Sequence, residues 1–281
     1  MTDSSTWSQM TLITALVNIN RQQVDGRTFQ DYVNWFCQTI QIPAPMVIYA
    51  EPMLEEIVKE IRKELPTKFI PTNFANLPLA WSYDLVTSIQ QSSEFQKKMK
   101  KPQDLANRLA GYPIVTNSKF AWIWNVLQEN PFHTDLFFWI DGGLSRFWKF
   151  INPVKMGPHP DLLKILRETN KIYTQVGGYH EQIIFNTLNG NKLAEDDIIG
   201  ANPSYLMAGF FGGTKDVLLN LCEESLCNYV KEMLQKRRID HDQALLYWHF
   251  ANHIDKYILI PPHPTLDVFN FLLFASGHSL V

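Results

Sequence analysis

Three short apolar segments constrain the fold of this chain more than any other feature. They are "TLITALVNI" (residues 11–19), "MVIYAE" (46–51) and "LFFWI" (136–140). None of them alternates strictly between apolar and polar residues, so each is typical of a strand that is buried on both faces of a sheet. The first two are followed by helical patterns, with apolar stripes at Tyr32, Trp35, Phe36 and Ile40 and at Leu54, Ile57, Ile61 and Leu65. Strand and helix in alternation predict an α/β fold with a Rossmann-like, mainly parallel sheet flanked by helices.

Further elements are expected along the rest of the chain. The spacing predicts a helix that begins at Ser118 as N-cap, and another that runs from Thr214 to about Arg237. Asp240 and Gln243 have the spacing of a capping box, which predicts a helix start at Asp240. Further strands are expected at "IYTQV", at "YLMAGFF" and at "KYILI", and the stretch 71–112 is expected to be helical.

Composition limits the domain organisation and the classes of partner. The 281 residues contain no internal repeat and no Ser/Gly-rich linker, so one domain spanning 1–281 is expected. A net charge of -3 without a long basic run argues against a nucleic-acid partner. The three cysteines form no C-x-x-C pair, which favours a reducing compartment. With neither a signal-peptide pattern nor a membrane-spanning apolar stretch, we expect a cytoplasmic protein without a transmembrane segment.

Asp141 is the first candidate site residue, because it follows a buried strand directly in "LFFWIDGG". In an open parallel sheet, ligands bind beyond the carboxyl ends of the strands. Gly142 and Gly143 would let a ligand approach the backbone closely. Asp-Gly is also a common strand-exit turn, and the local sequence favours neither interpretation.

Two later motifs are candidates for the same edge of the sheet. In "MAGFFGGTKD", Gly209, Gly212 and Gly213 surround a strand exit, although a tight turn explains them as well. In "DHDQALL", Asp242 lies in the first helical turn, where the helix dipole favours the ionised form that a general base requires.

The sequence motifs of several other enzyme classes are absent. The histidines do not form H-E-x-x-H, and a core or surface role is favoured for His249 and His253, although they can share one helix face. No G-x-S-x-G, P-loop or G-x-G-x-x-G is present. The sequence therefore argues against a serine hydrolase, a P-loop NTPase and a dinucleotide oxidoreductase.

The block "SKFAWIWNVLQENPFHTDLFFWIDGG" closely resembles the central block of the HtrL/YibB family, and "TLITALVNINR", "AGFFGGTKD" and "DHDQALL" resemble its other motifs. That family is associated with surface-polysaccharide synthesis and is similar to GT-A nucleotide-sugar glycosyltransferases. The later motifs are also similar to the donor half of ABO-type transferases. The resemblance implies a single GT-A domain, with a nucleotide-binding half at about 1–145 and an acceptor-binding half at about 146–281.

The resemblance also implies roles for individual residues. Asp141 would be the first carboxylate of a D-x-D motif that holds Mn²⁺ or Mg²⁺ on the donor diphosphate. Gly143 replaces the second carboxylate, and His278 is a candidate replacement ligand. Asp242 would be the catalytic base. The expected contacts to the donor come from Ala15, Val17, Asn18, Arg21, Lys119, Asp141, Gly142, Gly143, Gly212, Gly213 and Gln243, and Arg27 is a further candidate for the phosphates.

The implied function is transfer of a sugar from a UDP-sugar to a hydroxyl of a glycan. Gln243 stands where the ABO-type pattern has a Glu implicated in retention, and an amide is a poor nucleophile, so inversion is expected. The chain as a whole resembles xylosyltransferases of large algal viruses, which implies UDP-xylose and protein glycosylation. The alternatives are a non-catalytic nucleotide-sugar or glycan-binding module, a nucleotidyltransferase and a helical interaction protein.

Overall fold

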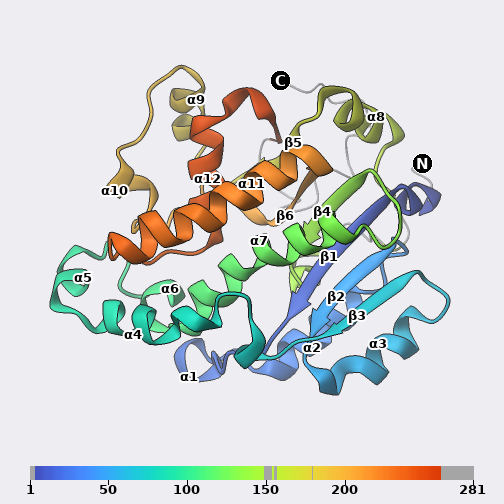
Figure 1. The fold of residues 1–281 in the computed structure, drawn as a ribbon, viewed down its shortest axis with the longest axis horizontal. Helices are drawn as coiled ribbons and strands as arrows, with labels where there is room; N and C mark the ends of the chain where they lie inside the picture. Colours follow the sequence, from blue (N-terminus) through green and yellow to red (C-terminus); the bar gives the residue numbers. More distant parts are fainter. Residues whose placement is uncertain (1–3, 149–153, 155–156, 179, 261–281) are drawn as a thin grey trace.

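The computed structural model describes residues 4–148, 154, 157–178 and 180–260, and it contains one sheet with helices on both faces (Figure 1). The strands are β1 (Met10–Leu16), β2 (Met46–Ala50), β3 (Thr67–Pro71), β4 (Leu136–Ile140), β5 (Ile172–Val176), β6 (Leu206–Thr214) and β7 (Tyr257–Ile260). The helices are α1 (Gln22–Asp25), α2 (Phe29–Thr39), α3 (Glu55–Arg62), α4 (Tyr83–Gln91), α5 (Ser93–Lys98), α6 (Leu105–Arg108), α7 (Gly111–Glu129), α8 (Pro160–Thr169), α9 (Glu181–Leu188), α10 (Glu195–Ile198), α11 (Lys215–Asn228) and α12 (Asp242–Asn252). Short 3₁₀ segments span Ser4–Gln9, Pro52–Leu54, Phe74–Asn76, Ala80–Ser82, Leu144–Phe147 and Ile254–Lys256, and α11 continues into a π-helical segment, Tyr229–Gln235.

The strands are ordered β3-β2-β1-β4-β6-β5-β7. Four neighbouring pairs are parallel, and β6 is antiparallel to both of its neighbours, β4 and β5. The predicted α/β class and the mainly parallel sheet are confirmed. Because β1 and β4 are parallel neighbours, their carboxyl ends lie at the same edge of the sheet.

Two apolar clusters cover the two faces of the sheet. Neighbouring strand residues alternate between them: Phe137 and Trp139 belong to the cluster that includes α7, α11 and α12, while Phe138 belongs to the cluster that includes α2, α3 and α8. This alternation follows from the two-residue period of a strand. It explains why "LFFWI" is apolar at every position, as expected for a strand covered on both sides.

The predicted inward face of α3 is partly wrong. Leu54 is buried, but Ile57 is 37% exposed, and the residues that complete the buried stripe are Val58 and Arg62. The guanidinium of Arg62 donates to the carbonyl oxygens of Ile40, Ile42, Ala44 and Pro66 and to the Thr67 hydroxyl. A buried arginine is tolerated here because its donors are paired.

The predicted start of the helix before β4 is also wrong. α7 begins at Gly111, and Ser118 is buried inside it rather than at its N-cap. Pro113 lies in the first turn, where its missing N–H costs no hydrogen bond. The helical character of 71–112 is confirmed by α4, α5 and α6, whereas the edge strand β3 was not predicted.

The segments around β6 and α12 differ from expectation in two respects. Gly212 and Gly213 do not follow the strand but pair within it, opposite Phe138 and Phe137. α12 begins at Asp242 with His241 as N-cap, so the predicted capping box at Asp240 is wrong. The buried Asp240 carboxylate instead accepts hydrogen bonds from the backbone of the 200–202 loop and of His241.

None of the helices in the described part of the chain is both long enough and apolar enough to cross a membrane. His278 lies outside the described residues.

Candidate active site

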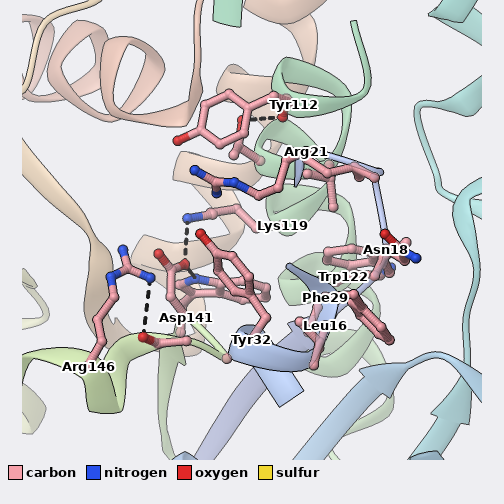
Figure 2. Close-up of a pocket in the computed structure, with 18 residues that line it drawn as sticks. Leu16, Asn18, Arg21, Phe29, Tyr32, Tyr112, Lys119, Trp122, Asp141 and Arg146 are labelled. Atoms are coloured by element: carbon pink, nitrogen blue, oxygen red, sulfur yellow. Dashed lines mark hydrogen bonds and ion pairs between the residues drawn. The ribbon is translucent and has the colours of Figure 1, made fainter. Parts of the chain in front are cut away.

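A pocket opens at the carboxyl ends of β1 and β4 (Figure 2). The segment after β1 forms one wall, the Asp-Gly-Gly segment after β4 forms another, and α2 and α7 contribute side chains. The residues that line it are Ala15, Leu16, Val17, Asn18, Ile19, Arg21, Phe29, Tyr32, Tyr112, Val115, Thr116, Lys119, Trp122, Trp139, Asp141, Gly142, Gly143 and Arg146. The position is where the parallel-sheet rule predicts a ligand site.

Asp141 is the acidic residue of this wall, and neighbouring donors orient its carboxylate. Its backbone N–H donates to the carbonyl of Gly209, with an N–O distance of 2.8 Å. Its Oδ1 accepts hydrogen bonds from Trp139 Nε1 at 2.7 Å and from Lys119 Nζ at 3.2 Å. A Cβ on Gly209 would lie 3.3 Å from Oδ2, so the glycine leaves room beside this oxygen. The side chain of Asp141 stays 39% exposed.

Lys119 is buried, and its ammonium lies between two carboxylates. It forms ion pairs with Asp141 and Asp242 and donates to the carbonyl of Ala208 at 2.9 Å. The Trp139 ring centroid is 5.0 Å from the ammonium. Burial by itself would lower the pKa of Lys119, but the Coulombic attraction of Asp141 and Asp242 outweighs it and raises the pKa. Lys119 therefore remains charged and joins the end of β4 to the start of α12.

Asp242 lies in the first turn of α12 and is buried. It contacts the Lys119 ammonium but is not one of the residues that line the pocket. His241 approaches it, with 3.9 Å between His241 Nδ1 and Asp242 Oδ1. The residue predicted as the base thus contacts Lys119 without itself lining the pocket.

Gly142 and Gly143 both line the pocket, and a Cβ on either would meet a close neighbour. A Cβ on Gly142 would lie 2.6 Å from the backbone oxygen of Ala15. A Cβ on Gly143 would lie 3.0 Å from the guanidinium of Arg146, which donates to the Gly143 carbonyl. Gly142 therefore lets the end of β4 pass close to the end of β1, whereas Gly143 adjoins the side chains of Arg146 and Tyr32.

The pocket brings together the predicted donor-binding residues near β1. Ala15, Val17, Asn18 and Arg21 all line it. The Asn18 side chain accepts a hydrogen bond from the backbone N–H of Asn20 at 2.9 Å. Arg21 forms an ion pair with Asp25, and its guanidinium lies 5.0 Å from the ring centroid of Tyr32.

The other predicted residues lie elsewhere. Gly213 pairs with Phe137 near the start of β4 and Gly212 pairs with Phe138 at its middle, so neither lies at the end that leads to Asp141, and neither lines the pocket. A Cβ on Gly212 would lie 2.4 Å from the backbone oxygen of Phe137, so close strand packing accounts for this glycine. Gln243 lies in the first turn of α12 and Arg27 follows α1, and neither lines the pocket.

Arg146 and the aromatic side chains of the wall were not predicted as site residues. Tyr32, which its helical spacing places on an inward face, points into the pocket beside Arg146 (Figure 2). Arg146 is the first basic residue after Asp-Gly-Gly, and this position was the one sequence signal that could have identified it.

The pocket wall carries three cationic side chains, Arg21, Lys119 and Arg146, and the carboxylate of Asp141. Among the described residues, however, Lys119 is paired with Asp141 and Asp242, and Arg21 is paired with Asp25. Arg146 is therefore the cation of this wall that is left to attract an anionic ligand.

The donor set at Asp141 fits a hard cation only in company with a ligand. The Lys119 ammonium forms an ion pair with Asp242 and donates a hydrogen bond to Asp141 Oδ1. Asp141 Oδ1 also accepts from Trp139, so Asp141 Oδ2 has no hydrogen bond to the described residues. Mg²⁺ commonly accepts one or two carboxylates together with phosphate oxygens and water. Among residues 4–148, 154, 157–178 and 180–260, the three-residue group with metal-ligating spacing lies elsewhere, at Glu224, His249 and His253.

Comparison with solved structures finds distant similarities. One is the crystal structure of mouse xyloside xylosyltransferase 1 in its apo form, at 11% identity and a TM-score of 0.43, covering 89% of this chain and 84% of that one. Another is 4-diphosphocytidyl-2C-methyl-D-erythritol synthase from Anaerococcus prevotii DSM 20548, at 11% identity and a TM-score of 0.36, covering 96% and 97%. Both TM-scores are below 0.5, so neither similarity assigns a function.

A search of curated protein sequences found no match. A match to a protein-family model covers residues 8–275, nearly the whole chain, and that family is described as "Bacterial protein of unknown function (HtrL_YibB)". The chain therefore belongs to the HtrL/YibB family.

Proposed function

We propose that this protein is a glycosyltransferase that moves a sugar from a nucleotide diphosphate donor to a hydroxyl of a glycan. The observation that carries the proposal is the charged cluster of Lys119, Asp141 and Asp242 beside a cationic, aromatic pocket at the carboxyl ends of β1 and β4. A nucleotide diphosphate has the two features that this pocket complements, an aromatic base and a compact negative charge.

The proposed donor site extends from β1 to β4. The base and ribose lie beside Ala15, Val17 and Asn18, among the aromatic residues of the wall. The diphosphate lies toward Asp141, where Arg21 and Arg146 supply cationic donors. A guanidinium suits this task because it presents several N–H donors in a planar fork.

A divalent ion, Mg²⁺ or Mn²⁺, would be held on the diphosphate by Asp141 and would neutralise the charge of the leaving group. Lys119 fixes the orientation of Asp141 through its ion pair. Its positive charge also offsets the repulsion between Asp141 and the phosphates.

The proposed reaction is a direct displacement with inversion. The acceptor oxygen forms a bond to the anomeric carbon as the bond from that carbon to the diphosphate oxygen breaks. The acceptor proton passes to the carboxylate of Asp242, and the nucleoside diphosphate leaves with the bonding electrons. Because Asp242 is paired with Lys119 in this structure, the step requires Asp242 to exchange that contact for the acceptor hydroxyl.

The finer assignments rest on the sequence resemblance. UDP is the proposed nucleotide and xylose the proposed sugar, with a role in polysaccharide or protein glycosylation in the cytoplasm. We also propose that the two halves, 1–145 and 146–281, work as one domain. In support of this, β6 of the second half pairs with β4 of the first.

The proposal is tested by calorimetric titration of the protein with UDP-sugars, with and without Mn²⁺, and by assay of UDP release with glycan acceptors. We expect UDP-sugar binding that Mn²⁺ strengthens and that Asp141→Asn weakens by about tenfold or more. The matched control is Asp84→Asn, which alters an exposed carboxylate on α4. Equal donor affinity in Asp141→Asn and Asp84→Asn would reject the site.

A non-catalytic nucleotide-sugar or glycan-binding module is the second candidate. It is favoured by the burial of Asp242, which contacts Lys119 but does not line the pocket, and by the presence of one carboxylate, Asp141, among the described residues of the pocket wall. Donor binding without UDP release, across a panel of acceptors and with Mn²⁺ present, selects this candidate. Pyrophosphate release would instead select a nucleotidyltransferase.

A further inference from the structure

A second group of ligating side chains lies between α11 and α12, away from the pocket. Glu224 is on α11, His249 is in the last turn of α12, and His253 follows that helix directly. Their ligating atoms all lie within 4.8 Å of one another. None of the three lines the pocket at Asp141.

Helix geometry brings the two histidines together. His249 and His253 are four residues apart, so they lie one turn from each other on the same face, and their ring centroids are 4.4 Å apart. Glu224 reaches them from the neighbouring helix, with 3.0 Å between Glu224 Oε2 and His253 Nε2. The three donors therefore converge on one point from two helices.

His249 has the surroundings of a metal-binding imidazole. Its Nδ1 lies 2.7 Å from the Tyr257 hydroxyl, which also approaches the Leu246 carbonyl at 3.5 Å. Asn220 Oδ1 accepts a hydrogen bond from His249 Nε2–H, so Nδ1 accepts from the Tyr257 hydroxyl. A metal at Nε2 would take the place of that proton and of Asn220, and Nδ1–H would then donate to the Tyr257 oxygen. Outer partners of this kind commonly fix the tautomer and ring orientation of a ligating histidine.

The remaining side of the cluster is polar and accessible. Asn220 Oδ1 lies 3.0 Å from His249 Nε2, and the Asn220 amide donates to Glu224 Oε1 at 3.1 Å. The side chains of Glu224 and His253 are 35% and 32% exposed. A metal ion can therefore reach the cluster past these two side chains, which are free to change rotamer. The buried His249 would be the fixed ligand.

We propose that Glu224, His249 and His253 form a binding site for a divalent transition metal, with Zn²⁺ as the best fit. Two imidazole nitrogens and one carboxylate oxygen are a known zinc donor set, with a fourth position for water. Bond lengths of about 2.0–2.2 Å place the donors of a tetrahedral zinc site about 3.3 Å apart. Rotation of Glu224 and His253 brings the present donors to that separation, and the metal replaces their hydrogen bond.

Imidazole ligands separate this site from the one proposed at Asp141. Mg²⁺ prefers oxygen ligands, whereas nitrogen donors favour Zn²⁺, Co²⁺, Ni²⁺ and Cu²⁺. The metal would clamp the end of α12 to α11. Since α12 begins at Asp242, the clamp would also hold the helix that carries the proposed base.

The site is tested by titrating Co²⁺ and then Zn²⁺ into the metal-free full chain. We expect one equivalent of Co²⁺ to produce the visible absorption of a tetrahedral complex, Zn²⁺ to displace it, and Zn²⁺ to raise the Tm. Glu224→Gln and His253→Gln should each weaken Zn²⁺ binding by about 100-fold or more and abolish the Tm increase.

Matched controls separate this site from adventitious binding and from the pocket. Glu223→Gln alters the adjacent carboxylate, which faces Trp124 instead, and should bind Zn²⁺ as the wild type does. Asp141→Asn should also leave the Co²⁺ spectrum unchanged. Circular dichroism of each metal-free variant verifies its fold. Absence of one-equivalent binding, or unchanged Zn²⁺ affinity in both Glu224→Gln and His253→Gln, would overturn the proposal.

Discussion

Lys119 and Asp141 form an ion pair on the pocket wall, with 3.2 Å between Lys119 Nζ and Asp141 Oδ1. The same ammonium also contacts Asp242. One buried cation thus compensates two carboxylates, one at the end of β4 and one at the start of α12. The pocket and the packing of α12 against α7 depend on the same charge.

Lys119→Met should destabilise the fold strongly. It leaves Asp242 buried without its counter-ion, and breaking a buried pair in this way costs about 3–5 kcal/mol in the free energy of unfolding. Urea denaturation measures the loss. Lys68→Met breaks an exposed pair with Glu129 and should cost no more than about 1 kcal/mol. Similar losses in the two variants would contradict the structural role of Lys119.

Asp242→Asn should separate catalysis from donor binding. If Asp242 is the base, kcat for sugar transfer falls by about 10²–10⁴-fold, because an amide cannot accept the acceptor proton. The Kd for UDP-sugar should change less than in Asp141→Asn, since Asp242 does not line the pocket and reaches it only through Lys119. Kinetics with saturating donor, beside calorimetry, measure both quantities. A kcat within tenfold of the Asp84→Asn control would assign the proton transfer to another group.

Gly142→Ala should disturb the junction between β4 and β1. The added Cβ would approach the backbone oxygen of Ala15 to 2.6 Å, and backbone cannot move aside as a flexible side chain can. We expect a loss of about 1–3 kcal/mol in the free energy of unfolding together with weaker donor binding. Gly178→Ala, where the Cβ meets nothing within 4 Å, should stay within about 1 kcal/mol of wild type. Equal stability of the two variants would disprove the packing argument.

His249 should make the stability of the metal-free protein depend on pH. Burial lowers its folded pKa to about 4, whereas the unfolded chain binds a proton near its ordinary pKa of 6.5. The unfolded state therefore binds more protons between these values, and the free energy of unfolding rises as pH increases from about 4 to 6.5.

The size of this effect is as much as about 3 kcal/mol, and His249→Gln should remove it. The measurement is urea denaturation of wild type and variant across this pH range, with EDTA present. Their difference should change with pH. A pH-independent difference between wild type and His249→Gln would show that His249 titrates normally in the folded state.

The sequence by itself determined the class of the fold and the edge of the sheet at which the pocket lies. Strands buried on both faces must be apolar at every position, so "LFFWI" and "MVIYAE" were recognisable, and Asp141 and Asn18 follow from where such strands end. These are local properties, because hydrophobic periodicity reflects the environment of each element without reference to its partners.

Tertiary structure decided which residues meet. Arg62 lies outside the apolar stripe that the sequence predicts for its helix, but carbonyl groups of other segments give it a buried place. Gly212 and Gly213 looked like a loop, but their pairing with β4 makes them strand. Lys119, Asp141 and Asp242 come from three separate segments, and only the docking of α7 and α12 at the sheet edge brings their charges together. Such charges are stable in the interior only as a paired set, and that pairing is a property of the packed fold that no single segment encodes.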